Sequence, residues 1–151
     1  MTSTTGSTQR SRPVSTAAVV THGSKDVHEA VARVEAVAAS GGVTLVADPR
    51  EADLAVAVGG DGTILRTLGK LLGSDVPVIG VNFGRVGFLA SIAPDALERD
   101  LARVFSGEYA VVELPTLELA LDGERHIAVN DVVATSSVLG RMVELGWAVG
   151  G

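Results

Sequence analysis

The chain has 151 residues, which is enough for one domain or for one domain and part of a second. Apolar residues make up 46% of the chain, aromatic residues make up 3%, and the formal net charge is −6. No block of basic residues offsets that charge, which argues against nucleic acid as the main partner. The chain has no cysteine, which excludes disulfides and thiolate metal sites and favours a cytoplasmic location.

The first 16 residues are rich in Ser and Thr and predict a disordered tail. No apolar stretch precedes Ala17, which argues against a secretory signal. No apolar run in the sequence approaches the roughly 20 residues that a bilayer-spanning helix needs. We therefore expect no membrane partner.

Strands and helices are predicted to alternate from residue 17 to residue 106. The segment ADLAVAV is apolar on both faces, as central strands of parallel sheets are. The predicted elements are, in chain order, a strand over 17–20, a helix over 26–39, strands over 43–47 and 52–58, a helix after Gly62, a strand over 76–81 and a helix over 94–105. They indicate an α/β domain with an open, mostly parallel sheet flanked by helices.

Residues 107–151 follow a different pattern and predict the first strands of an all-β domain. TLELAL and ERHIAV alternate apolar and polar residues around Asp122-Gly123, which is a hairpin signal. RMVELGWAVGG, over residues 141–151, predicts a further strand. We expect this second domain to be incomplete.

The segment Gly59-Gly60-Asp61-Gly62-Thr63 follows the predicted central strand, where open α/β sheets bind ligands. Glycines let the backbone approach a phosphate, and the N-terminus of the next helix attracts an anion. A carboxylate repels phosphate, so Asp61 makes sense if it orients an attacking hydroxyl or holds a metal for phosphoryl transfer. The alternative is an Asp-Gly turn in which Asp61 caps the helix. The chain has neither the P-loop pattern nor the G-x-G-x-x-G fingerprint.

Two further candidates lie close to this loop in the predicted fold. Arg66 belongs to a polar helix stripe with Thr63, Thr67 and Lys70, and either reaches back to a ligand phosphate or is part of a solvated face. Asn82, in NFGRVGFLA, follows the fourth strand and is expected at the same sheet edge as Asp61. An Asn-headed turn is the alternative there.

The remaining candidates lie in the β segment or are histidines. Asn130 and Asp131 interrupt an apolar run, which is costly unless a ligand or a hairpin turn satisfies them. Histidines 22, 28 and 126 share no metal-ligand spacing, so no metal site built from protein ligands is expected. His22 follows the first strand and could line the same sheet edge.

In this order, GGDGT, NFGRVGFL and AVNDVV resemble the motifs of the NAD kinase family. GGDGT alone is shared with diacylglycerol and sphingosine kinases and, more loosely, with phosphofructokinases. NFGRVGFL is similar to the family's N-x-G-x-x-G-F-L, whereas lipid kinases carry a Gly-Thr-Gly-Asn-Asp type segment that this chain lacks. The resemblance runs from about Ala17 to the end of the chain.

The resemblance implies a kinase that moves the γ-phosphoryl of ATP to the 2′-hydroxyl of the adenosine ribose of NAD, giving NADP. It implies that Asp61 is the proton acceptor, and that a divalent metal, usually magnesium, neutralises the phosphates. It also implies a homo-oligomer for an intact family member. The implied nucleotide-contacting residues are Gly59, Gly60, Asp61, Gly62, Thr63, Arg66, Asn82, Asn130, Asp131 and Arg141.

The family continues into an all-β domain with an Asp-Gly segment and a Thr-Pro-x-Gly-Ser-Thr stretch, and this chain stops at Gly151 before both. We therefore expect a truncated NAD kinase that can be inactive by itself. Two other hypotheses stay open: a non-catalytic nucleotide-binding remnant, and a lipid-directed kinase that shares only GGDGT. The sequence does not distinguish ATP from polyphosphate as the donor.

Overall fold

The computed structural model describes residues 7–10, 12–22, 27–83, 88–138, 140–144 and 146. The chain divides into two compact units, Met1–Pro115 and Thr116–Gly151. Each unit is described by itself.

The first unit is built on a four-stranded parallel sheet, which confirms the predicted fold class. Its strands are β2 (Thr16–Thr21), β3 (Thr44–Leu45), β4 (Leu54–Gly59) and β5 (Val78–Asn82), in the spatial order β3-β2-β4-β5. All six residues of β4 are buried, as the continuous apolar run predicted. Strand β3 pairs with β2 at Thr16 and Ala17, so within the described residues the carboxyl half of β2 has a neighbouring strand, β4, on one side only.

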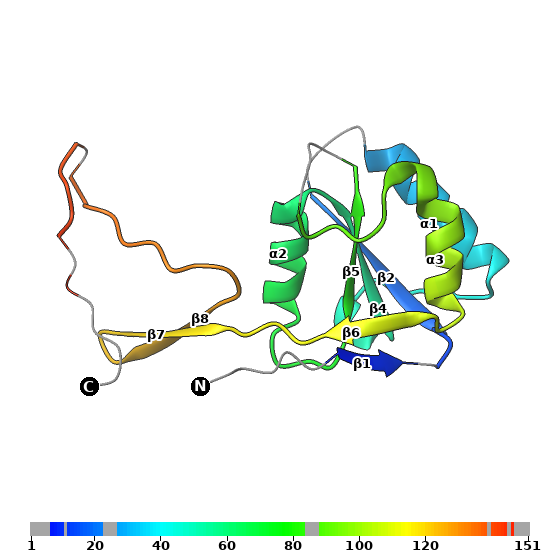
Figure 1. Cartoon of the computed structure of the whole chain (residues 1–151), viewed down its shortest axis with the longest axis horizontal. Helices are drawn as coiled ribbons and strands as arrows, with labels where there is room; N and C mark the ends of the chain where they lie inside the picture. The colour runs from blue at the N-terminus through cyan, green and yellow to red at the C-terminus, as the bar shows by residue number, and fades with distance from the viewer. Residues whose placement is uncertain are drawn as a thin grey trace. The chain divides into compact units, whose positions relative to one another are not determined.

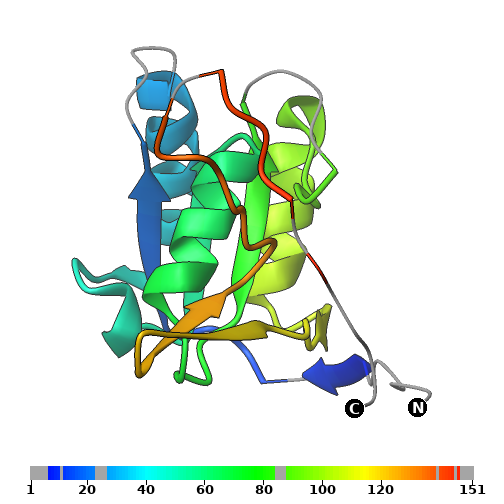
Figure 2. The ribbon, with the colours of Figure 1, turned by 90° about the vertical axis from the view of Figure 1, so that its left-hand side faces the viewer.

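Helices cover both faces of this sheet. Helices α1 (Val27–Ser40) and α3 (Leu97–Phe105) lie on one face and α2 (Asp61–Lys70) lies on the other (Figures 1 and 2). Two short 3₁₀ helices, η1 (Pro49–Glu51) and η2 (Pro94–Ala96), begin with proline, whose fixed φ suits a first helical position. The predicted helix over 94–105 is therefore a 3₁₀ turn followed by α3.

The two faces of the sheet carry side chains of different size, because successive residues of a strand point to opposite faces. Leu54, Val56 and Val58 of β4 pack in one core with α1 and α3. Ala55 and Ala57 alternate with them and point to the α2 face. A Cβ at Gly80 would overlap the Ile64 Cδ1 methyl of α2 and lie 3.1 Å from Ala90 Cα. These small residues let α2 lie close to the sheet.

The amino-terminal segment differs from the expected tail over residues 1–16. Strand β1 (Ser7–Arg10) pairs antiparallel with β6 (Tyr109–Val112), and Val14 N–H donates to Phe105 O at 2.9 Å. The expectation failed because a polar strand can be held by backbone hydrogen bonds to a partner far along the chain. Strand β6 was not predicted either, and it belongs to the first unit although the sequence suggested a boundary at residue 107.

The second unit contains the predicted hairpin. Strand β7 (Leu117–Leu121) pairs antiparallel with β8 (Glu124–Ala128). Asp122 and Gly123 have φ values of 52° and 83°, the left-handed conformations that a type I′ turn requires. The strand predicted over 141–151 is absent from its described residues, 141–144 and 146. Within the described part of this unit, β7 and β8 are the only strands that pair. Residues 141–144 and 146 have no strand to pair with there, and a β-strand needs such a partner.

Among the helices of the described residues, none has both the length and the apolar composition to cross a membrane.

Asp53 ties the segment before β2 to the start of β4. Its Oδ2 accepts from Ser15 N–H and Thr16 N–H, both at 3.0 Å, and from Thr16 Oγ1 at 3.2 Å, while Arg12 donates to Oδ1 at 2.7 Å. The hydrogen bond from Thr16 N–H, more than any other contact, lowers the pKa of the Asp53 carboxyl below its usual value.

This geometry predicts a pH-dependent loss of stability in Asp53→Asn. The folded pKa lies below the unfolded value of about 3.9, so the carboxylate stabilises the fold above that value and loses its effect as the pH falls. We expect the variant to lose about 1–3 kcal/mol of unfolding free energy at pH 7, as for hydrogen bonds to a charged group. The difference between the two proteins should shrink below pH 4 in urea titrations. A difference that stays constant from pH 7 to pH 3 would contradict this role.

Candidate functional site

Three parallel strands end at one level and bring their following residues to a single edge. Thr21 of β2 is paired with Val58 of β4, and Gly59 of β4 is paired with Asn82 of β5. The register therefore places His22, the loop after Gly59, and Asn82 along the carboxyl edge of the sheet. The prediction that Asn82 and Asp61 share this edge is confirmed.

The turn from β4 into α2 depends on a glycine. Gly59 has a φ of +152°, and a Cβ there would lie 2.5 Å from Thr63 Oγ1. Gly60 is the N-cap of α2, and its carbonyl accepts from Thr63 N–H at 2.9 Å and Ile64 N–H at 3.3 Å. Gly62, the second helical residue, is exposed. The N-terminus of α2 thus opens at the sheet edge, where its dipole favours an anion.

Asp61 is the first residue of α2 and does not cap it. Gly60 holds the N-cap position without a side-chain hydrogen bond, so the capping alternative for Asp61 is not what the structure has. Phe88 N–H donates to Asp61 Oδ2 at 3.0 Å, and Leu89 N–H donates to Oδ1 at 3.1 Å. Both carboxylate oxygens are oriented by the second loop, and each keeps a further lone pair for another donor.

The second loop begins beside the first. Phe83 N–H donates to Gly59 O at 3.3 Å, and Asn82 N–H donates to Ile92 O at 2.9 Å, so the chain returns alongside β5. The turn glycines noted in the sequence, Gly84 and Gly87, lie outside the described residues. Asp61 contacts the far end of this loop, and its two ends are therefore both fixed against the β4–α2 turn.

Arg33 of α1 fixes the base of the second loop from the opposite face of the sheet. Its guanidinium lies 5.7 Å from the centroid of the Phe83 ring, and it donates to Glu98 Oε1 at 2.6 Å and to Pro94 O at 2.7 Å. The hydrogen bond from Arg33 lowers the pKa of Glu98 to about 2. One side chain thus connects α1, the start of η2 and the residue after Asn82.

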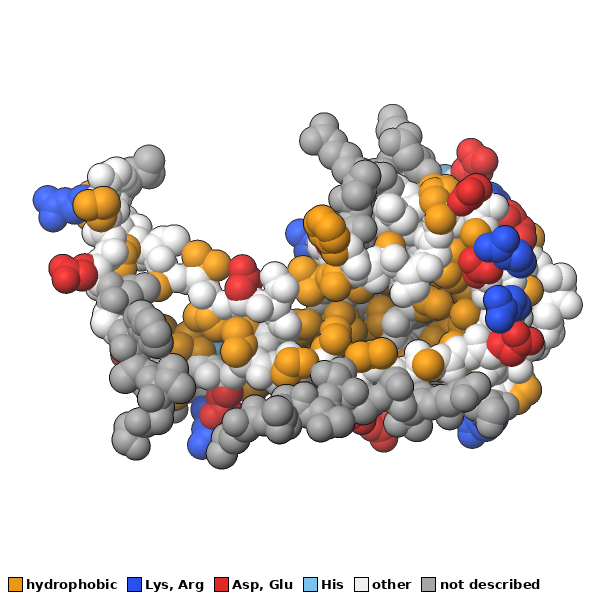
Figure 3. All heavy atoms as spheres, viewed as in Figure 1, with side chains coloured by type: hydrophobic (Ala, Val, Ile, Leu, Met, Phe, Trp, Pro, Cys, Tyr) orange, Lys and Arg blue, Asp and Glu red, His pale blue; other side chains and the backbone are white. Residues whose placement is uncertain are grey.

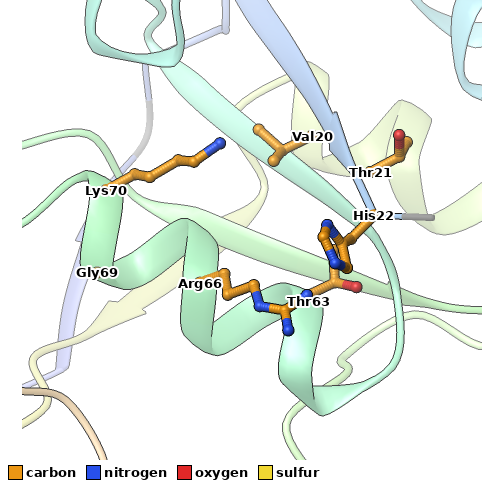
Figure 4. Close-up of a pocket in the computed structure, with 7 residues that line it drawn as sticks. All are labelled: Val20, Thr21, His22, Thr63, Arg66, Gly69 and Lys70. Atoms are coloured by element: carbon orange, nitrogen blue, oxygen red, sulfur yellow. The ribbon is translucent and has the colours of Figure 1, made fainter.

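The polar stripe on α2 divides into a buried and an exposed part. Thr63 and Thr67 are buried, and Thr67 Oγ1 donates to Thr63 O at 2.8 Å. Arg66 and Lys70 are exposed and line a cavity of about 420 Å³ between α2 and the end of β2 (Figure 4). We call this the β2–α2 cavity; its lining residues are Val20, Thr21, His22, Thr63, Arg66, Gly69 and Lys70. Sequence reasoning assigned no role to Lys70 and only a possible place to His22.

The remaining predicted residues belong to the second unit. Asn130 and Asp131 are exposed and follow β8, and they do not form the hairpin turn considered as an alternative, which is made by Asp122 and Gly123. Arg141 is exposed, and its N–H donates to Val138 O at 3.3 Å. These three residues are therefore described only within the second unit.

Comparison with known proteins gives a consistent result. Residues 5–109 match the family model of the ATP-NAD kinase N-terminal domain. The chain is 42% identical over 113 residues to the NAD kinase of Nitratidesulfovibrio vulgaris, an alignment that covers 72% of this chain and 40% of that protein. It is also 42% identical over 106 residues to the NAD kinase of Azoarcus sp., covering 66% of this chain and 36% of that one.

A solved structure is similar as well. The crystal structure of an NAD kinase from Archaeoglobus fulgidus in complex with ATP superposes with a TM-score of 0.51 at 35% identity, covering 59% of this chain and 36% of that chain. The chain thus spans at most 40% of the length of these three proteins.

Proposed function

This chain belongs to the ATP-NAD kinase family. We propose that the loops at the carboxyl edge of its parallel sheet form one side of the active site of a kinase that phosphorylates NAD. In this reaction the 2′-hydroxyl of the adenosine ribose attacks the γ-phosphorus of ATP. A new oxygen–phosphorus bond forms, the bond to the β-phosphate oxygen breaks, and ADP leaves with the electron pair. NADP and ADP are the products, and the hydroxyl proton needs an acceptor.

We propose that Asp61 accepts that proton, and its geometry is the observation that carries the proposal. Its carboxylate lies at the carboxyl end of β4, at the N-terminus of α2, and both of its oxygens are held by backbone N–H groups. A base whose orientation is fixed before the substrate binds is what phosphoryl transfer needs, since positioning supplies most of its catalysis. The backbone of Gly59, Gly60, Gly62 and Thr63 would then lie against the nucleotide phosphates.

The described residues do not supply a cage for a metal ion. Among them, no group of three or more His, Cys, Asp and Glu side chains is placed to hold one. We propose that Mg²⁺ would be carried by the nucleotide, because that ion is commonly held by substrate phosphates and one or two carboxylates. When bound, it would neutralise phosphate charge.

We carry over the remaining roles from the family motifs. Arg66 and Asn82 would contact the nucleotide from the first unit, and Asn130, Asp131 and Arg141 would contact NAD from the second. A cytoplasmic location, NADP biosynthesis and homo-oligomeric assembly are part of the same proposal for the intact protein.

Ligand-dependent stabilisation tests the substrate class. The experiments use the full-length protein that the complete reading frame encodes, called here the complete reading-frame product. We expect NAD and ATP–Mg²⁺ to raise its thermal unfolding midpoint, because a ligand that binds only the folded state stabilises it. Diacylglycerol micelles should leave the midpoint unchanged. Stabilisation by the lipid but not by NAD would refute the proposal and favour the lipid-kinase hypothesis. Binding of NAD without any formation of NADP would favour the non-catalytic remnant.

A further inference from the structure

The β2–α2 cavity concentrates positive charge on a chain whose net charge is −6. Three of its lining side chains, His22, Arg66 and Lys70, are basic groups. None of its described lining residues is Asp or Glu. A volume of about 420 Å³ falls in the usual range for small-ligand sites.

Within the described residues, Arg66 and Lys70 have no acidic partner, unlike four other arginines of the first unit. Arg12, Arg33, Arg99 and Arg103 each form an ion pair with a carboxylate. Basic and acidic side chains are accordingly intermingled over the α1 and α3 side in Figure 3. No hydrogen bond or ion pair is found for the Arg66 or Lys70 side chain within the described residues. Their charge is free to meet a ligand.

The spacing of these cations suits an extended anion. Arg66 and Lys70 are one turn apart on α2, which separates them by about 6 Å along the helix axis. His22 stands at the carboxyl edge of the sheet, level with Gly59. Figure 4 shows the Lys70 side chain reaching from α2 toward Val20 of β2. A ligand with several linked negative groups could contact all three basic side chains along the cavity.

A second cavity continues this one along β2. It has a volume of about 460 Å³ and shares Val20, Thr21 and Lys70 with the first. Arg50 and Asp48 line it, and they are engaged locally: Arg50 Nη2 donates to Lys70 O at 2.5 Å, and Asp48 Oδ1 accepts from Arg50 N–H at 2.9 Å. Lys70 therefore lies where the two cavities meet.

We infer that the β2–α2 cavity binds a chain of linked phosphates through Lys70, Arg66 and His22. The inference that the cavity binds phosphates rests on its lining residues. The identity of the molecule that carries these phosphates rests on the proposed function. In a kinase of NAD it would be the triphosphate of the donor, inorganic polyphosphate, or the diphosphate of the dinucleotide. Lys70 and His22 are then phosphate-binding residues that lie outside the sequence motifs.

Calorimetric titration with inorganic tripolyphosphate tests the inference on the complete reading-frame product. We expect measurable binding that weakens as NaCl is raised, because the cations are exposed. Lys70→Gln should weaken it about tenfold, the lower end for a hydrogen bond to a charged group. Lys70→Arg should retain binding within about threefold. Arg99→Gln, which removes the same charge from α3, should leave the affinity within about twofold.

Competition identifies the carrier. Displacement of tripolyphosphate by ATP but not by NAD assigns the cavity to the donor, and the reverse result assigns it to the dinucleotide. No binding to the wild-type protein, or equal losses in Lys70→Gln and Arg99→Gln, would overturn the inference even if NADP is formed. Lys70-dependent binding without any NADP formation would instead support the phosphate-binding role of the cavity and refute the proposed NAD kinase activity.

Discussion

Asp61→Asn in the complete reading-frame product is expected to lower the rate of NADP formation by roughly 10²–10⁴-fold, the usual contribution of a general base. The carboxamide has nearly the shape of the carboxylate, and its oxygen can still accept one N–H from Phe88 or Leu89. It cannot take a proton from the ribose hydroxyl. NAD affinity should change little, so the loss should appear in kcat rather than in KM.

A second role of Asp61 makes a control necessary. Its carboxylate accepts from Phe88 N–H and Leu89 N–H, so the substitution also weakens the second loop. The thermal unfolding midpoint and the NAD dissociation constant of the variant report that structural effect. Asp95→Asn, an exposed carboxylate on η2, changes the net charge equally and should keep activity within about twofold. Activity of Asp61→Asn within a few-fold of wild type would mean that Asp61 only holds the loop.

The parts of the site that the sequence predicted are those encoded within one short segment. The buried run of β4, the glycines after it and the apolar periodicity of α2 lie within 20 residues of each other and specify a strand, a turn and a helix. The parallel arrangement then follows from the alternation of strands and helices. Asp61 and Asn82 could therefore be assigned to one edge before any coordinates were known.

Long-range contacts explain what the sequence did not predict. The hydrogen bonds that Asp61 accepts join residues 27 and 28 positions apart, and no local pattern marks them. The pairing of β1 with β6 is of the same kind, because its polar strand has no amphipathic signal. Thr67 looked solvated on α2, yet it is fully buried, since the small residues of the sheet bring the helix close. Its hydroxyl is satisfied by Thr63 O within the helix.

For a related reason, sequence analysis gave Lys70 no role and gave His22 only a possible place at the sheet edge. A lysine at the end of a helix is commonly a solvated residue, and a histidine after a strand is commonly part of a loop. Their proposed binding role depends on both side chains lining one cavity, and this in turn depends on how α2 packs across β2. A useful signal was present in the sequence, because His22 follows a strand that ends at the same edge as β4.

The 151-residue chain expressed alone is expected to form NADP at least about 10²-fold more slowly than the full-length NAD kinase of Nitratidesulfovibrio vulgaris. It spans 40% of that protein, and its family match covers the N-terminal domain. Phosphoryl transfer depends on holding donor and acceptor in line, and a misplacement of about 1 Å can cost that factor. The proposed contacts of Asn130, Asp131 and Arg141 come from a unit whose described residues form a single hairpin.

The same unit should also be the least stable part of this chain. A two-stranded hairpin is marginal by itself in water, and Leu117, Leu121 and Ile127 are each about half exposed. Exposed apolar residues and open strand edges favour association. We therefore expect limited proteolysis to remove residues beyond about 116 first and size-exclusion chromatography to show aggregates, while the sheet of the first unit resists digestion. A monodisperse, protease-resistant 151-residue protein that forms NADP at the full-length rate would refute both expectations.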